Sequence, residues 1–575
     1  MPHKSRWSID IPTQSLPSYV FESPTADLED KPIIIDAEWP EVHLTHRSYR
    51  EWAKRLAAGL RKKGLQPGDR ILLYSGNTVF FPVIIMGTVM AGGIFTGANP
   101  SYVARELAYQ LKDSGAKFLI TAEGSLDTAL EAASSLKFPR DHIFVMGDGS
   151  EMFKSQQPKA SRGLQHWSTL LAPASEGSKF AWKEFNSRKE MNATAVLNYS
   201  SGTTGLPKGV EISHMNYISN CVQTDYIARL DPEYEEKVGR AKVLSFLPLY
   251  HAYGQTHHSV SSVRKGIPVY LMRKFDFIKM LQWIQKYRIT GLPLVPPVAV
   301  ALAKRKEVRD YDISTVEGAG VGAAPLSSES INDFEKAFGR RFQLKAGYGM
   351  SGKEITCSAT GWDPTRESDP SKVGELNPNI EAKLVDDDGK EVADGERGEL
   401  LIRGPNVMKG YWKKPDATKD TMTEDGWLKT GDIAIYHSDG CLSIVDRKKE
   451  LIKVKGNQLA PAELEGLLLE HPAISDAAVI GVTVRYIDQT NKTRDRSGEE
   501  KPRAYVVLQQ GQSASPEDIA SWLAERVTSY KRLTGGVKLV KEIPKNPSGK
   551  ILRKILREQA KEELEKGGGR RESKL

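Results

Sequence analysis

The chain is organised around the sequence YSSGTTGLPKG at residues 199–209. This stretch combines hydroxyl side chains, glycines and one lysine, namely Ser200, Ser201, Gly202, Thr203, Thr204, Gly205, Lys208 and Gly209. Glycine lets a backbone turn tightly and approach a ligand closely. Apolar runs at 193–197 and 210–212 predict a strand on each side. Because hydroxyl and backbone N–H groups that converge in a concavity form an anion site, we expect this loop to bind phosphate.

The stretch is not the common P-loop, which requires GxxxxGK[ST] at the start of a helix. The alternative is a flexible serine- and glycine-rich linker. Pro207 and Lys208 within the stretch, and the apolar strands beside it, argue against a linker. The stretch resembles the phosphate loop of the adenylate-forming superfamily, which includes acyl-CoA synthetases, 4-coumarate–CoA ligases, beetle luciferases and peptide-synthetase adenylation domains.

Length and composition limit the possible classes of protein. A chain of 575 residues is too long for one core, so we expect several domains or subdomains. A net charge of +8 spread over this length does not indicate nucleic-acid binding, although it suits anionic ligands such as nucleotides. The cysteines Cys221, Cys357 and Cys441 are widely spaced and form no CxxC, which disfavours a disulfide framework or a zinc site and favours a reducing compartment.

The apolar stretch 79–98 is long enough to be mistaken for a membrane span. Its proline and glycines argue against this, and we predict a buried helix over 79–91 that leads into a strand at 93–96. The N-terminal residues MPHKSRWSIDIP lack the apolar region of a secretory signal. Strand-like runs at 70–74, 117–121 and 142–146 alternate with helical ones, which predicts α/β layers, whereas 150–190 is expected to be loop.

The chain ends in Ser573, Lys574 and Leu575. A terminal SKL is a peroxisomal address that an import receptor reads, and the alternative is a chance tripeptide. We therefore expect a peroxisomal protein with that receptor as a partner.

Residues 242–248 predict a strand, and the sequence LYHAYG follows at 249–254. His251 therefore lies just past a strand end, where α/β sheets place ligands. The segment resembles the fourth motif of the superfamily. This resemblance implies that His251 borders the carboxylate substrate and that Tyr253 lines the acyl pocket. The default interpretation of His257 and His258 is a core or surface role.

The sequence GAGVGAAPL at 318–326 places small residues in a row, which lets a flat ring lie against the backbone. In the superfamily the equivalent stretch lies against adenine, which implies this role for Gly322, Ala323 and Ala324. A tight turn before a helix at 327–338 is a compatible structural explanation. We expect Val321 and Gly347 to shape the acyl pocket with Tyr253.

The sequence GYGMSGKE at 347–354 is similar to the superfamily motif GYGMTE. That motif implies that Tyr348 stacks on adenine, that Ser351 contacts the α-phosphate and that a glutamate holds Mg²⁺. Glu354 arrives two residues late. Either Gly352 and Lys353 are an insertion and Glu354 still reaches the metal, which we favour, or the metal carboxylate is missing.

Two downstream segments continue the resemblance. GELLIRG at 398–404 is similar to the second signature of the coumarate–CoA ligases, and WLKTGD at 427–432 ends in Asp432. A carboxylate at a turn can accept two hydrogen bonds, which the vicinal hydroxyls of ribose require. The resemblance implies this role for Asp432.

The charged segment DRKKELIKVKG at 446–456 is either a solvated strand or, by resemblance, the hinge to a C-terminal lid. The resemblance implies that Arg447 contacts ribose and phosphate, that Lys449 is the pivot and that Gly456 lines the entry of the thiol. Lys453 and Gln458 would act at the nucleotide or in the second step. Further along, PKNPSGK at 544–550 is similar to the tenth motif, whose lysine, here Lys550, bridges the carboxylate and the α-phosphate; an ordinary exposed lysine is the alternative.

Together these motifs imply the α/β adenylate-forming fold, with a large N-terminal domain (1–446) and a small α+β C-terminal lid (447–575). The implied activity is an AMP-forming acyl- or aryl-CoA ligase that uses ATP, Mg²⁺ and coenzyme A. A luciferase-like oxygenase and a non-catalytic nucleotide-binding relative are the alternatives. The carboxylic acid is left open among phenylpropanoid, phenylacetate-like and medium-chain fatty acids.

Overall fold

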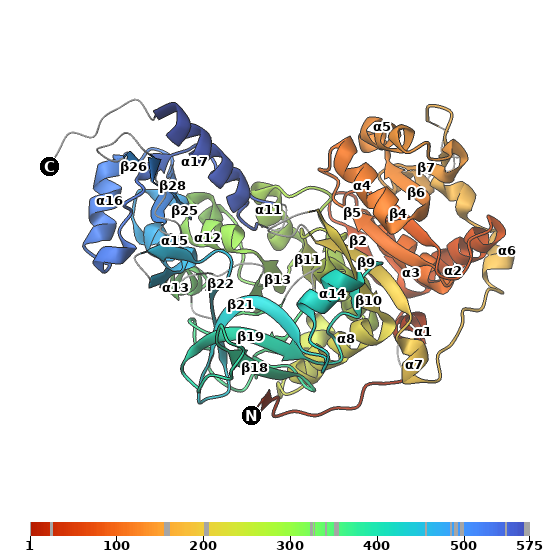
Figure 1. Ribbon diagram of the computed structural model, residues 1–575. Coiled ribbons are helices and arrows are strands. Elements are labelled where there is room, and N and C mark those ends of the chain that lie inside the picture. The colour runs from red at the N-terminus through yellow and green to blue at the C-terminus, as the bar shows by residue number, and fades with distance from the viewer. Residues whose placement is uncertain are drawn as a thin grey trace.

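The computed structural model describes residues 2–22, 27–153, 161–200, 206–322, 326, 328–339, 342–349, 356–454, 457–483, 486–487, 493–494, 500–546 and 549–567. They form a large body with three large sheets and the small sheet of β16 (Thr360–Gly361) and β17 (Glu375–Leu376), and a smaller C-terminal body, the lid, shown in blue in Figure 1. The predicted domain boundary after residue 446 falls inside strand β22, which ends at Arg447.

The first sheet has eight strands and is buried on both faces. In spatial order they are β20 (Gly410–Tyr411), β10 (Lys208–Ser213), β9 (Thr194–Ser200), β5 (Ile94–Ala98), β4 (Arg70–Tyr74), β6 (Ala116–Ala122), β7 (Ile143–Met146) and β8 (Gln165–His166). Along β4, Ile71 and Leu73 join the core that includes α2 (His46–Lys62) and α3 (Phe81–Met90). Leu72 and Tyr74 join the opposite core with α4 (Ala104–Ser114) and α5 (Leu126–Ser135). This alternation is what a strand between two helical layers requires.

Helix α3 explains the long apolar stretch in the sequence. Every residue of the helix is buried, and β5 follows it, so the predicted helix and strand are confirmed. A β-carbon at Gly87 would lie 2.8 Å from the side chain of Leu56 in α2, so the glycine permits close packing of the two helices. Within the described ranges, no helix is both long and apolar enough to cross a membrane.

The second sheet has seven strands and carries most of the site. Its order is β15 (Leu344–Ala346), β14 (Gly318–Val321), β13 (Gly291–Leu294), β11 (Val243–Ser245), β12 (Val269–Leu271), β2 (Pro32–Asp36) and β3 (His43–Thr45). All neighbours except β2 and β3 are parallel. Strand β11 is shorter than predicted, and beyond its end the Leu247 carbonyl accepts a hydrogen bond from the Asn77 side chain (3.1 Å).

Helices α11 (Phe277–Tyr287), α12 (Pro296–Lys304) and α13 (Ser328–Ala337) share a hydrophobic core with this second sheet. The large body also contains the 15-residue helix α8 (His214–Ala228). Its remaining short elements are α1 (Leu16–Phe21), α6 (Ala174–Gly177), α7 (Arg188–Met191), α9 (Tyr234–Arg240), α10 (Ser262–Arg264), α14 (Pro415–Thr421), β16 and β17. The segment 150–190, expected to be loop, holds only β8 and short helical turns in its described part.

The third sheet is antiparallel and includes the N-terminus. Its order is β1 (His3–Lys4), β18 (Glu381–Val385), β19 (Arg397–Arg403), β21 (Leu428–Tyr436) and β22 (Leu442–Arg447). Just after β1, Arg6 pairs with Glu375 (2.6 Å) and Asp363 (2.7 Å), whose side chains are 8% and 9% exposed. The first residues of the chain are therefore tied to residues far along the sequence.

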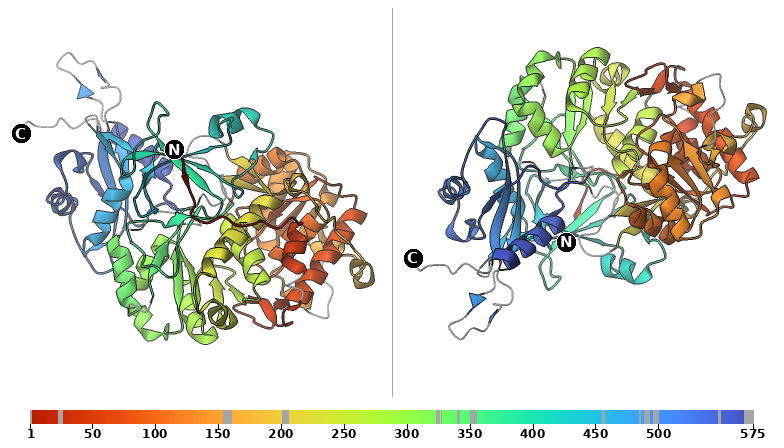
Figure 2. Two further views of the ribbon diagram at one scale, coloured as in Figure 1. Left: turned by 90° about the horizontal axis from the view of Figure 1, so that it is seen from below. Right: turned by 90° about the horizontal axis from the view of Figure 1, so that it is seen from above.

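The lid has its own core. Its elements are β23 (Ile452–Val454), β24 (Asn457–Leu459), α15 (Pro461–Glu470), β25 (Ile474–Val482), β26 (Tyr486–Ile487), β27 (Thr493–Arg494), β28 (Lys501–Leu508), α16 (Pro516–Ala524), β29 (Val537–Leu539) and α17 (Arg553–Gly567). Ser515 caps α16, because its side chain accepts a hydrogen bond from the backbone N–H of Asp518. Figure 2 shows the lid at the end of the molecule opposite α2–α5.

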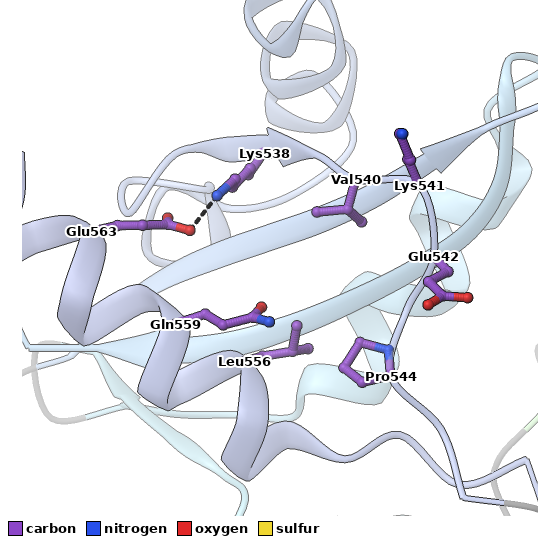
Figure 3. Close-up of a pocket in the computed structure, with 8 residues that line it drawn as sticks. All are labelled: Lys538, Val540, Lys541, Glu542, Pro544, Leu556, Gln559 and Glu563. Carbon is purple, nitrogen blue, oxygen red and sulfur yellow. Dashed lines mark hydrogen bonds and ion pairs between the residues drawn. The ribbon is translucent and has the colours of Figure 1, made fainter.

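A cavity of about 440 Å³ lies on the lid between α17 and the segment after β29 (Figure 3). Its lining residues are Lys538, Val540, Lys541, Glu542, Pro544, Leu556, Gln559 and Glu563. None of them is a predicted site residue, and Lys538 and Glu563 form an ion pair with each other.

Candidate active site

Three predicted nucleotide-binding side chains meet at the junction of the second and third sheets. The Tyr348 hydroxyl, just past β15, donates a hydrogen bond of 2.6 Å to Asp432 Oδ2 on β21. Arg447, the cross-strand neighbour of Asp432 on β22, places its Nε 3.4 Å from Asp432 Oδ1. Tyr348 and Asp432 are 8% and 4% exposed. Burial, with the Asp432 carboxylate next, raises the pKa of Tyr348, so its hydroxyl is a neutral donor.

Small residues form a surface of backbone beside this cluster. The Gly347 N–H donates to the Val321 carbonyl (3.0 Å), and the Gly322 N–H donates to the Leu294 carbonyl (3.3 Å). The structure therefore brings Val321, Gly322, Gly347 and Tyr348 together at the ends of β13, β14 and β15. Ala323 and Ala324 lie outside the described residues.

Residues that the sequence did not single out hold this cluster in place. The Tyr348 N–H donates to Thr360 Oγ1 (3.0 Å), and its carbonyl accepts from the Ala359 N–H (2.9 Å). A β-carbon at Gly349 would lie 1.8 Å from the Cys357 carbonyl oxygen, so only glycine fits there. The second glycine of the GYG triplet, Gly349, was the signal in the sequence that could have indicated this close approach. Thr430 accepts from the Asp432 N–H (3.1 Å), which explains the threonine of TGD.

The phosphate loop is described only at its two ends. Ser200 on β9 pairs with Lys208 on β10, so the two described ends of the stretch lie side by side. The ammonium of Lys208 lies 4.8 Å from the centre of the Tyr411 ring. Ser201, Gly202, Thr203, Thr204 and Gly205 lie outside the described residues, and the predicted phosphate contacts of the loop stay predictions.

The predicted acyl side is aromatic and uncharged. A π-helix spans Gly254–Ser261, and the rings of Tyr253 and His257 have centroids 4.5 Å apart. Burial lowers the pKa of His251 and His257 to about 4 and that of His258 to about 3, so all three are neutral at pH 7. His258 is 3% exposed and its Nδ1 lies 2.5 Å from Ser245 Oγ, which makes it a core residue.

The loop of the lid that contains Lys550 lies beside the large body. In its loop the Lys550 N–H donates to Asn546 Oδ1 (2.8 Å), and Gly549 adopts φ +79°. A β-carbon at Gly549 would lie 3.3 Å from Pro297 Cδ and 3.4 Å from Val295 Cβ, so the loop lies against the end of β13. Strands β13, β14 and β15 are neighbours, so about two strand spacings, roughly 10 Å, separate this point from the end of β15.

The roles of the other predicted lid residues stay predictions. Lys453 and Gln458 are an exposed cross-strand pair on β23 and β24, and Lys449 is exposed in the turn before them. Gly456, Ser351 and the proposed metal ligand Glu354 lie outside the described residues. Among the residues that are described, no group of three or more His, Cys, Asp or Glu side chains could hold a metal ion.

Comparisons with known proteins identify the family of the chain. Residues 21–412 match the model for "AMP-binding enzyme", and residues 463–550 match that for "AMP-binding enzyme C-terminal domain". A phenylacetyl-CoA ligase from Aspergillus niger is 36% identical, covering 97% of this chain and 99% of that protein. A 4-coumarate–CoA ligase from Humulus lupulus is 35% identical, covering 94% of this chain and 93% of that protein.

The ATP-bound structure of MatB from Rhodopseudomonas palustris, 25% identical, superimposes with a TM-score of 0.77, and its apo structure with 0.69. Each alignment covers 96% of this chain and 99% of the other. With family models matching both bodies and relatives of this similarity over nearly the whole length, the chain belongs to the AMP-binding enzymes of the adenylate-forming superfamily.

Proposed function

We propose that the protein is an AMP-forming acid–thiol ligase that joins a carboxylic acid to coenzyme A. In the first step the carboxylate attacks the α-phosphorus of ATP and releases pyrophosphate, leaving an acyl-adenylate. In the second step the thiol of coenzyme A attacks the acyl carbon and releases AMP. The observation that carries this proposal is that two features lie at the strand ends of the second sheet. The loop that contains Lys550 lies against the end of β13, and Tyr348, just past β15, joins the cluster with Asp432 and Arg447.

The first step brings a carboxylate to an anionic phosphate, so positive charge is needed where the two meet. Preorganised charges of this kind are usually a large catalytic contribution, and removal of one contact costs about 10²–10³ in rate. Lys550 would supply the charge between the carboxylate and the α-phosphate. Asp432 and Arg447 would hold the ribose, and His251, which is neutral, would orient the carboxylate rather than attract it.

Magnesium would neutralise phosphate charge when it is bound with ATP. A Mg²⁺ ion held by one carboxylate, waters and substrate phosphates needs no cluster of protein ligands, which agrees with the lack of such a cluster among the described residues. Glu354 would be that carboxylate.

We propose an aromatic monocarboxylic acid as the substrate. The rings of Tyr253 and His257 offer aromatic surface, and the neutral histidines give this side no positive charge to pair with a second carboxylate. Similarity to ligases named for phenylacetate and 4-coumarate supports this class. Peroxisomal import through Ser573, Lys574 and Leu575 is part of the same proposal.

The test is pyrophosphate release with MgATP across a panel of aromatic and aliphatic monocarboxylic acids and dicarboxylic acids, with and without coenzyme A. We expect release with arylacetic or phenylpropenoic acids, and formation of the matching CoA thioester when coenzyme A is present. Nucleotide binding without release on any acid would refute the ligase assignment. Faster turnover of fatty or dicarboxylic acids would refute only the aromatic class.

A further inference from the structure

A cluster of buried charges lies at the hinge, outside the proposed nucleotide site. It contains three carboxylates, Asp446, Glu450 and Glu465, which are 7%, 6% and 9% exposed. Two arginines from α17 accompany them: Arg553 pairs with Glu465, and Arg557 pairs with Glu450. Burying a charge costs free energy unless the charge is paired. We therefore expect this cluster at the proposed hinge to have a specific role.

One part of the cluster lies wholly within the lid. Arg553 donates two hydrogen bonds of 2.7 Å to Glu465, which also accepts from the Val479 N–H (2.8 Å). Arg553 is only three residues beyond Lys550, so this bidentate pair fixes one end of the lysine loop to α15. On the other end, Lys545 pairs with Asp476 at 2.7 Å. These contacts would move with the lid as one unit.

Asp446 is different because it lies on the other side of the hinge. It belongs to β22, where it pairs with Ile433 of β21 in the large body. Its Oδ2 accepts a hydrogen bond of 3.0 Å from the Ala462 N–H in the first turn of α15, and its Oδ1 accepts from the Arg447 N–H (2.6 Å). Burial raises the pKa of Asp446, and the positive charge of Arg553 opposes this by lowering it.

We propose that Asp446 is a latch that holds the lid in the pose in which Lys550 reaches the large body. If the lid turns about Lys449, the hydrogen bond between Asp446 and the start of α15 must break and the charge of Arg553 moves away, whereas the pair of Arg553 and Glu465 survives. A carboxylate at a helix N-terminus is a favourable, charge-dependent contact. The inference rests on the proposed two-step reaction and makes Asp446 a positioning residue for its first step.

The test compares Asp446→Asn and Asp446→Ala with a matched control, Glu558→Gln. Asparagine keeps an acceptor for the Ala462 N–H but removes the charge, and alanine removes both. Glu558 is an exposed carboxylate of the lid that forms only a loose pair with Lys554 (3.9 Å). Three quantities are measured: adenylate formation, thioester formation from supplied acyl-adenylate, and trypsin cleavage after Lys448 or Lys449 in the free protein.

For Asp446→Asn we expect adenylate formation to slow about tenfold, the size of one lost charge-assisted contact. Asp446→Ala should slow it further, while thioester formation stays within about twofold of wild type and hinge cleavage becomes faster. Parallel loss of both half-reactions, or unchanged adenylate formation and cleavage, would overturn the latch. If wild type adenylates no acid, the proposed function fails, and the cleavage rates still decide whether Asp446 holds the lid.

Discussion

Replacing Tyr348 by phenylalanine removes one hydroxyl and keeps the ring that would stack on adenine. That hydroxyl donates to Asp432 at 2.6 Å, and both residues are almost fully buried. A hydrogen bond to a charged group contributes about 1.5–3 kcal/mol, which corresponds to about 10- to 150-fold in kcat/KM for ATP. Arg447 stays near the carboxylate at 3.4 Å, so we expect the lower half of that range.

The assay is the initial rate of pyrophosphate release as ATP is varied at saturating acid. The matched control is Tyr234→Phe, because the Tyr234 hydroxyl also donates to a carboxylate, Asp225, at 2.6 Å, and Tyr234 is likewise 8% exposed. It lies on α9, away from the proposed nucleotide site. We expect both variants to lose stability and only Tyr348→Phe to lose kcat/KM for ATP. A change below twofold in Tyr348→Phe, or an equal change in the control, would refute the assignment of Asp432 to ribose.

Further predictions concern the lysine loop, the buried histidines and the C-terminus. Lys550→Ala should abolish adenylate formation but spare thioester formation from supplied acyl-adenylate; equal loss in both assays would contradict lid exchange. In the unfolded chain His258 binds a proton as the pH falls below about 6.5, whereas in the folded protein it does so only near its pKa of about 3. The free energy of unfolding should therefore fall between pH 6.5 and pH 4, by up to about 1.4 kcal/mol per pH unit for this residue alone. His258→Asn should reduce that slope in calorimetric unfolding scans between pH 5 and 7, and an unchanged slope would contradict a neutral His258. Deletion of Ser573, Lys574 and Leu575 should move a fluorescent fusion from peroxisomes to the cytosol, and unchanged localisation would show that another signal directs it.

The sequence predicted the fold where local patterns and packing agree. The apolar run before β5 became a helix with every residue buried, because α2 and the first sheet cover it on both sides. The motifs also predicted that Tyr348 and Asp432 share a site, although 84 residues separate them. Resemblance rather than local pattern supplied that prediction.

The structure of the charged segment 446–456 could not be predicted from the sequence in the same way. Its charges suggested a solvated strand or a hinge, yet Asp446 and Glu450 are buried. The arginine that pairs with Glu450 lies 107 residues further along the chain, so no local pattern reveals it. Likewise, the Leu247 carbonyl just beyond β11 accepts a hydrogen bond from Asn77, which is 170 residues away.

The position of β1 has a consequence for how the chain is synthesised. Arg6 and its partner Glu375 are 369 residues apart, and a ribosome adds about 5–20 residues per second, so roughly 20–70 s pass before the partner is made. Throughout that interval β1 has no sheet to join. Once β18 forms, one of its edges stays open until β1 covers it. Strand β1 is therefore among the last parts of the large body to be fixed, and nascent-chain chaperones have long access to it.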